Sequence, residues 1–369
     1  MIYLDYAASA PPWPEAARAV YESMQTRFGN PGGLHQAGAQ ARAVLQASRK
    51  TIAALLGVRP EEVFFTSGGT EANNWAVKMA CAGSSKKHIV CATSEHKSVL
   101  ASVQAIASSG CTVTWLNPDR QGLIRLEAVQ AALRPDTALL CVQAVNNETG
   151  VLQDVDGLAA LARSRGVLYF CDAVQSFGHV SQNLHKADLF SLSAHKFGGP
   201  RGIGCLVVRY PNRLSPLIHG GGQEFGLRSG TENLPGIAGL SLAAELANAQ
   251  REAEAPRLQL LRSQLEEGLR RLCPGLLIAG EGAPRSPGIL CCAFPGHTGE
   301  ELTIRLDQRG ICVSPGAACS AQEGGPSHVL LSMGYLAGDA AGFVRFSLGP
   351  QTTEADIQYT LQAISDLVS

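Results

Sequence analysis

The chain has 369 residues, of which 45% are hydrophobic, enough for a sizeable core and too many for a wholly disordered protein. Its 30 Lys and Arg residues balance 31 Asp and Glu residues to a formal net charge of -1 at pH 7, without any basic tract, which argues against a nucleic-acid-binding protein. The length is typical of two domains.

The first residues lack the basic stretch and the long apolar stretch of a secretory signal, and no apolar run reaches the ~18 residues of a membrane span. We therefore expect a cytoplasmic protein that contacts no membrane. The 11 cysteines include no Cys-x-x-Cys pair, so we expect no metal site, and we expect no disulfides in a reducing compartment. Most of the cysteines lie in or beside apolar runs, as small buried side chains do.

Between residues 60 and 210, short apolar runs alternate with segments of helical spacing. The predicted strands are Val63–Thr66, His88–Ala92, Thr112–Leu116, Ala138–Val145, Val167–Asp172, Leu189–Ser193 and Ile203–Val208. The predicted helices between them are Glu71–Cys81, Ser98–Ala107 and Val155–Ser164. This alternation predicts an α/β fold whose mostly parallel sheet is covered on both faces.

Beyond residue 232 the pattern changes to that of a smaller α+β domain. Asn233–Leu272 is helical throughout and forms one helix or two. The elements predicted after it are a strand at Gly288–Phe294, a helix at Glu300–Arg309, a strand at Phe343–Ser347 and a helix at Thr353–Val368. A tract rich in Gly, Ala and Ser, Ser314–Gly325, is expected to be a mobile loop.

The segment 66–71 (Thr-Ser-Gly-Gly-Thr-Glu) follows a predicted strand and begins a predicted helix. Its glycines, Gly68 and Gly69, let a ligand approach the backbone, and the first N–H groups of a helix attract anions, so a phosphate is a suitable ligand. An ordinary helix cap by Ser67 or Thr70 explains the same residues. The segment is not a Walker A loop, because no Gly-Lys-Ser/Thr follows it.

Lys196 lies just past another predicted strand, at the sheet edge where α/β proteins bind ligands. Its amine could form a Schiff base with an aldehyde cofactor, although most lysines before a turn are simply exposed. Asp172 ends an apolar strand, where a carboxylate either needs a cationic partner, such as a protonated pyridine ring, or caps a following helix. Gln175, three residues on, could face the same pocket.

Two more polar groups follow predicted strands. His96 could stack on an aromatic ring and move protons, or simply cap a helix, and Asn146–Gly150 is either a turn or a ligand-binding segment. The carboxyl ends of parallel strands meet along one edge of the sheet, so all these groups are expected to converge. A phosphate cradle, a stacking group, a pyridinium partner and a Schiff-base lysine are the parts of a pyridoxal phosphate site.

With these motifs, the chain resembles the cysteine desulfurases of the NifS/IscS type, in the class V aminotransferase group of fold-type I pyridoxal-phosphate enzymes. The matching segments are 4–8, 28–31, 66–71, 94–97, 146–150, 172–176, 193–196, 219–224 and 228–233, and the resemblance extends to about residue 349. It implies a large cofactor-binding domain at residues 13–255. Residues 1–12 and 256–369 would form the small domain with the loop 314–325.

The resemblance implies a role for each residue around the cofactor ring. Lys196 would bind pyridoxal 5'-phosphate covalently and later shuttle protons. His96 would stack on the ring and assist proton transfer. Asp172 would pair with the ring nitrogen, and Gln175 would hydrogen-bond the phenolic oxygen.

The resemblance also implies residues that bind the phosphate of the cofactor and residues that bind the carboxylate of the substrate. The cofactor phosphate would be bound by Gly69, Thr70, Ser193 and His195. Thr231 resembles the residue that reaches the phosphate of the neighbouring subunit, which implies a homodimer. Asn147 and Arg345 would hold the carboxylate of the substrate, a task for which a bidentate guanidinium is suited.

Cys319, in the tract 314–325, resembles the loop cysteine that attacks the substrate sulfur and becomes a persulfide. The loop's length fits the long-loop subgroup, although Pro315 stands where Ser is common, and Ala8-Ser9-Ala10 precedes Pro11 where two threonines are frequent. The resemblance implies conversion of L-cysteine to L-alanine, with the sulfur passed to a protein acceptor. Selenocysteine lyase or another class V lyase, and a non-catalytic sulfur-transfer or scaffold paralogue, are the alternatives.

The resemblance does not imply which protein accepts the sulfur. The chain ends soon after its last predicted helix, without the extension that helps housekeeping members dock the scaffold for iron–sulfur cluster assembly. Iron–sulfur assembly is therefore one expected destination of the sulfur among several.

Overall fold

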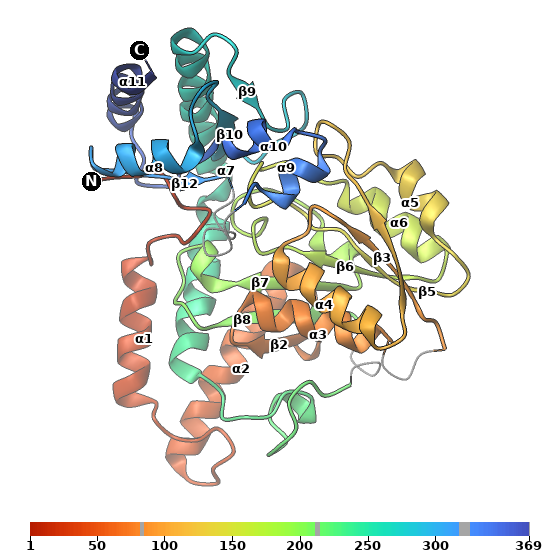
Figure 1. The fold of residues 1–369 in the computed structure, drawn as a ribbon. Helices are drawn as coiled ribbons and strands as arrows, with labels where there is room; N and C mark the ends of the chain where they lie inside the picture. The colour runs from red at the N-terminus through yellow and green to blue at the C-terminus, as the bar shows by residue number, and fades with distance from the viewer. Residues whose placement is uncertain (82–84, 211–214, 317–324, 369) are drawn as a thin grey trace.

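The computed structural model describes residues 1–81, 85–210, 215–316 and 325–368. The largest sheet of this part has seven strands in the order β2-β8-β7-β6-β5-β3-β4 (Figure 1). In chain order the strands are β2 (Val63–Thr66), β3 (His88–Ala92), β4 (Thr112–Leu116), β5 (Thr137–Cys141), β6 (Leu168–Asp172), β7 (Leu189–Ser193) and β8 (Gly204–Val208). Strand β8 runs antiparallel to both neighbours and all other pairs are parallel, so the predicted mostly parallel sheet is confirmed.

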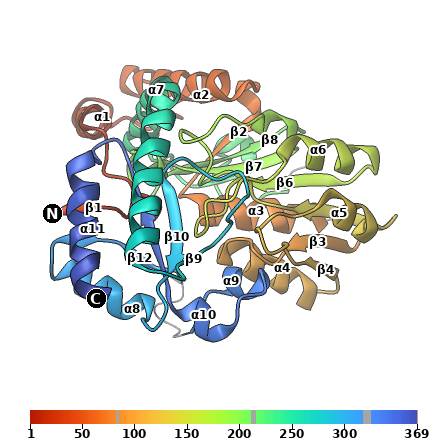
Figure 2. The same cartoon turned by 90° about the horizontal axis from the view of Figure 1, so that it is seen from above.

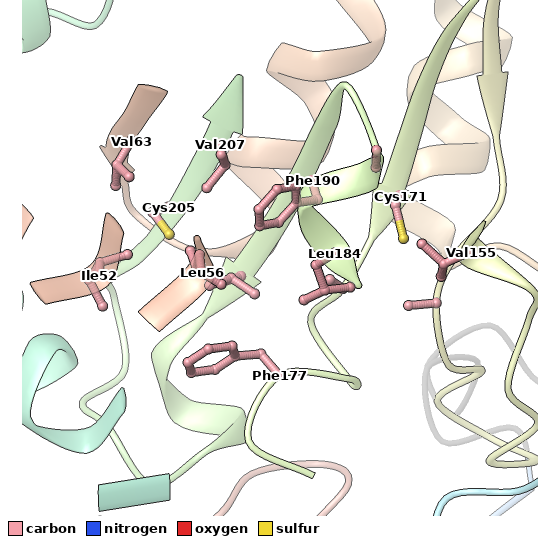
Figure 3. Packing of buried hydrophobic residues seen from close by; sticks show 14 of the residues in the cluster. Ile52, Leu56, Val63, Val155, Cys171, Phe177, Leu184, Phe190, Cys205 and Val207 are labelled. Carbon is pink, nitrogen blue, oxygen red and sulfur yellow. The ribbon is translucent and has the colours of Figure 1, made fainter. Parts of the chain in front are cut away.

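Helices cover both faces of this sheet, because its strands bear apolar side chains on both sides. In β8, Cys205 and Val207 belong to one apolar cluster, whereas Leu206 and Val208 belong to the cluster on the opposite face. Figure 3 shows the first of these clusters, in which Phe190 of β7 packs with helix and loop residues. The helices of this part are α1 (Pro14–Thr26), α2 (Gln36–Leu56), α3 (Gly69–Cys81), α4 (Lys97–Ser108), α5 (Leu126–Ala132) and α6 (Val155–Ser164).

A second, antiparallel sheet lies in the C-terminal part, in the order β12-β13-β10-β9 (Figure 2). Its strands are β9 (Leu277–Ile278), β10 (Ile289–Ala293), β12 (Ser314–Pro315) and β13 (Phe343–Ser347). The helices around it are α8 (Gly299–Asp307), α9 (His328–Ser332), α10 (Ala337–Ala341) and α11 (Glu354–Val368). In β10, Cys291 and Cys292 belong to different apolar clusters, as expected for neighbours on a strand.

The first residues of the chain lie beside this C-terminal part. Strand β1 (Ile2–Tyr3) pairs in parallel with β11 (Ile311–Cys312), and Leu4 belongs to the apolar cluster formed by residues 258–367. The long helix α7 (Leu234–Leu272) joins the two parts. Its residues up to Ala247 pack in the cluster of the large sheet, and those from Leu258 on pack in the C-terminal cluster. The domain boundaries at 12/13 and 255/256 stay a prediction.

Most predicted elements lie within two residues of the observed ones. Of the two alternatives for Asn233–Leu272, the single helix is confirmed, and it continues through Pro256. Strand β5 ends at Cys141 rather than at Val145, because Val145 turns away to pair with Leu152. The elements not among the predicted ones are the helices α1, α2, α5, α9 and α10 and the two-residue strands β1, β9, β11 and β12.

Short 3-10 helices complete the description: Pro60–Glu62, Leu184–Lys186, Ala194–Lys196 and Glu224–Gly226. Within the described ranges, no helix combines the length and apolarity needed to cross a membrane.

Candidate active site

A cavity of about 270 Å³ lies at the carboxyl ends of the parallel strands. It is lined by ten of the residues singled out in the sequence: Gly69, Thr70, His96, Asn147, Asp172, Gln175, Ser193, His195, Lys196 and Arg345. Nine of them lie in or just after strands β2, β3, β5, β6 and β7, and Arg345 lies in β13. The fold therefore gathers these residues at the edge where a parallel sheet offers a ligand site.

Two predicted residues are not in this cavity. Thr231 is exposed and does not line it, which leaves its predicted role toward a second subunit untested. Cys319 and most of the predicted loop 314–325 lie outside the described residues. Of that loop, Ser314–Pro315 forms strand β12 beside β13.

Helix α3 begins at Gly69, so its first backbone N–H groups have no carbonyl partner within the helix. A Cβ on Gly69 would come within 2.8 Å of the Val174 side chain, which explains why glycine is needed at this close approach. The loop before the helix is held by Glu71, which accepts from Ser67 N at 2.8 Å and forms an ion pair with Arg228 at 2.7 Å. The result is a fixed, open helix start facing the cavity.

Asp172, the last residue of β6, is buried and accepts two hydrogen bonds. Val174 N donates to Oδ1 at 3.0 Å and Asn73 Nδ2 donates to Oδ2 at 2.7 Å. Neither donor carries a charge, so within the described ranges this buried carboxylate has no cationic partner in its hydrogen bonds. Nearby, Gln175 Oε1 is buried with no hydrogen-bond partner among the described residues. Both groups are suited to bind a ligand that offers a positive ring nitrogen and a hydrogen-bond donor.

The amine of Lys196 lies against the N-terminal segment of the chain. Its Nζ donates to Ala7 O at 2.6 Å and to Ala8 O at 3.0 Å. That segment is fixed by Ser347 of β13, whose Oγ accepts from Ala7 N at 2.9 Å. On the other side, His179 Nε2 lies 2.9 Å from Lys196 O and donates to it, since a carbonyl can only accept. Lys196 is therefore held by the N-terminal segment, which β13 in turn fixes, and by His179.

The histidines around the cavity are held neutral. Burial, together with the charges of Lys196 and Arg201, lowers the pKa of His195 to about 4. Burial is also the largest cause that lowers the pKa of His96. Neutral imidazoles can donate or accept single hydrogen bonds to a ligand without adding a positive charge.

Arg345 is buried beside the cavity and already has partners. Its Nη2 forms an ion pair with Asp5 Oδ1 at 2.8 Å, and its Nη1 donates to Asn147 O at 2.9 Å. Ser314 Oγ donates to the same oxygen of Asp5 at 2.8 Å. The Nε of Arg345 has no partner among the described residues, so part of this guanidinium remains available to an anionic ligand.

Several cavity residues were not predicted from the sequence. Asn73, Ser98, Gln143 and the Ala7–Ala8 pair all line it. The position of Asn73, one helical turn after Thr70, is a signal that could have identified it, because residues three apart on a helix share a face. The contact of Ala7 and Ala8 with Lys196 depends on tertiary structure and leaves no local pattern.

Comparison with known proteins agrees with this site. The family model for aminotransferase class-V matches residues 2–360. A cysteine desulfurase IscS from Dictyoglomus turgidum is 38% identical, over all of this chain and 94% of the relative. A solved NifS-like protein superposes with a TM-score of 0.93 at 34% identity, covering all of this chain and 99% of the other. SspA, solved in complex with cysteine, superposes with a TM-score of 0.84 at 32% identity, covering 96% of this chain and all of the other.

The predicted resemblance is thereby confirmed, as is the fold of a fold-type I enzyme. The chain belongs to the aminotransferase class-V family and, within it, to the cysteine desulfurases of the NifS/IscS type.

Proposed function

We propose that this cysteine desulfurase uses pyridoxal 5'-phosphate to convert L-cysteine to L-alanine and leaves the sulfur as a persulfide on Cys319. The observation that carries the proposal is the single cavity lined by Lys196, Asp172 and His96 beside the open start of helix α3. When bound, the cofactor supplies an electron sink that weakens bonds to the Cα and Cβ atoms of an amino acid.

The described residues fit this cofactor. The phosphate suits the first N–H groups of α3 with Ser193 and His195, because helix starts attract anions. Asp172, a buried carboxylate whose hydrogen bonds with other described residues involve no cation, suits a protonated ring nitrogen. Gln175 Oε1, which has no hydrogen-bond partner in the part of the chain that the structure describes, suits a hydroxyl donor on the ring. Lys196 Nζ supplies the amine for covalent attachment.

Three side chains of the protein would bind the substrate, move its protons and accept its sulfur. Arg345, with Asn147 beside it, would hold the substrate carboxylate through the part of its guanidinium that Asp5 does not occupy. Lys196 Nζ would move protons at the carbon atoms of the substrate, once its bonds to Ala7 O and Ala8 O are released. The Cys319 thiolate would form the new S–S bond as the C–S bond of cysteine breaks, and the carbon that loses sulfur gains a proton.

We further propose a cytoplasmic homodimer with Thr231 reaching the neighbouring subunit, and a protein acceptor for the persulfide sulfur. The exposure of Thr231 away from its own cavity supports the first of these. The membership in the NifS/IscS type supports the second.

The decisive experiment measures sulfide and alanine released from L-cysteine, with a thiol reductant, by the cofactor-loaded protein and by Cys319→Ala. Equal amounts of both products, lost in the variant while the cofactor still binds, are the expected result. Formation of both products by Cys319→Ala would contradict a persulfide on Cys319 and would favour another class V lyase. Comparing selenocysteine turnover by the wild-type protein and by Cys319→Ala tests the alternative of a selenocysteine lyase.

A further inference from the structure

His96 is the N-cap of helix α4, and this position restricts its imidazole. Its Nδ1 accepts a hydrogen bond from Ser98 N at 3.1 Å. A backbone amide can only donate, so Nδ1 must present its lone pair and cannot carry a proton in this arrangement. In a neutral imidazole the single proton then lies on the other nitrogen, Nε2.

A second donor reinforces the same state. Ser98 Oγ lies 2.7 Å from His96 Nδ1 and 2.9 Å from Asn73 Nδ2. The amide nitrogen of Asn73 must face Asp172, whose carboxylate can only accept, and it donates its second proton to Ser98 Oγ. The Ser98 hydroxyl therefore receives from Asn73 and gives its own proton to His96 Nδ1. The direction of every hydrogen bond from Asp172 to His96 is fixed.

Protonation of His96 at Nδ1 would break the bond from Ser98 N and would force the Ser98 hydroxyl to turn from donor to acceptor. Burial lowers the pKa of His96, and the nearby Lys196, His328 and Lys97 lower it further, whereas Asp172 acts in the opposite direction. The positive end of the α4 dipole also disfavours an imidazolium at this position. All local groups except Asp172 thus hold the ring neutral.

We propose that helix α4 and the hydrogen bonds through Asn73 and Ser98 hold His96 as the neutral tautomer with its proton on Nε2. In this tautomer His96 serves the reaction as a hydrogen-bond donor and not as the base that removes a substrate proton. This inference rests on the proposed function, since it assigns His96 a role in that reaction. Asn73 and Ser98 are then positioning residues, because they connect the tautomer of the His96 imidazole to the carboxylate of Asp172. Lys196 is the group that removes the substrate proton.

The test is ¹⁵N NMR of the histidine rings in the cofactor-free protein, with His96→Gln used to assign the His96 signals. We expect Nε2 to carry the proton and Nδ1 to carry none between about pH 6 and 8. In Ser98→Ala the tautomer should persist through the backbone donor, and the pKa of His96 should rise by about half a unit to one unit, since one of two donors to Nδ1 is lost.

The matched control is Ser102→Ala, which removes a buried hydroxyl one turn further along α4 and should leave the His96 signals unchanged. A proton on Nδ1 in the wild-type protein, or a doubly protonated ring at pH 7.5, would overturn the inference. An unchanged pKa in Ser98→Ala would remove Ser98 and Asn73 from it. None of these signals depends on turnover, so they remain interpretable if the chain proves not to release sulfide.

Discussion

Arg345 and Asp5, 340 positions apart, form an ion pair of 2.8 Å at the edge of the candidate active site. The pair brings the start of the chain to strand β13, and it places an internal carboxylate where Arg345 is proposed to meet the substrate carboxylate. Asp5 holds Nη2 of the guanidinium and the substrate carboxylate is proposed to take the remaining part, so the negative charge of Asp5 repels the substrate and lowers its affinity.

Asp5→Asn should therefore lower the KM for L-cysteine about threefold to tenfold, because it removes the repelling charge. Arg345→Lys should raise KM at least about tenfold, since an ammonium lacks the planar bidentate grip. Steady-state kinetics at saturating cofactor measure both effects. Ser314→Ala, which removes another partner of Asp5 without changing charge, is the control. Equal KM values in all four proteins would take substrate binding away from Arg345.

Glu148 gives a prediction for the dependence of stability on pH. Burial raises the pKa of its carboxyl group to about 7, although the Ser327 hydrogen bond and the charges of Arg345 and Lys97 lower it. Between pH 4.5 and about 7 the folded protein keeps a proton here that the unfolded chain has lost. The contribution of Glu148 to stability is thus fully present below pH 4.5 and is lost as the pH rises through about 7.

Glu148→Gln, which keeps the shape without the charge, should consequently gain stability relative to the wild-type protein as the pH rises from 4.5 to 7. The measurement is the urea midpoint of both proteins at half-unit steps of pH. A constant difference between the two midpoints across this window would show that Glu148 titrates normally.

The ion pair between Arg49 and Glu224 predicts a large loss of stability. Both side chains are buried, their closest approach is 2.5 Å, and Glu224 also accepts from Phe65 N at 2.8 Å. Glu224→Gln would leave the Arg49 guanidinium buried without its counter-charge, at a cost of about 3–5 kcal/mol in the free energy of unfolding. Glu301→Gln, which breaks an exposed pair with Arg305, should cost at most about 0.5 kcal/mol. Urea unfolding at one fixed protein concentration compares them, and equal losses would refute the argument.

The proposed sharing of sites between subunits can be tested by mixing inactive variants. If Thr231 completes the phosphate site of the partner, Thr231→Ala and Lys196→Ala should each be inactive alone. A mixed dimer of the two would contain one site with both defects and one intact site. Random reassociation of equal amounts then returns about one quarter of the wild-type activity. Activity that stays at the sum of the separate variants would exclude a shared site.

The sequence predicts the large sheet well because its strands are short, uniformly apolar runs separated by segments with helical spacing of apolar residues. Strands and helices are therefore easy to tell apart. The site residues at or just after strand ends, among them Thr70, His96 and Lys196, are predictable for the same reason. Arg345 lies inside β13 and is identified only through the family resemblance. Helix α1 is absent from the predicted elements, and it exposes two large apolar side chains, Tyr21 and Met24. The relay through Asn73 and Ser98 and the ion pair of Asp5 join residues that only tertiary structure brings together.

The contact of Lys196 with Ala7 and Ala8 bears on how the protein is made. The segment that carries these two carbonyls is bonded to Ser347 of β13, because Ser347 N donates to Leu4 O and Ser347 O accepts from Tyr6 N. During translation, the parallel strands with Lys196 emerge from the ribosome well before residue 347. The bonds from β13 that fix the Ala7–Ala8 segment beside Lys196 can therefore form only after nearly the whole polypeptide has been synthesised.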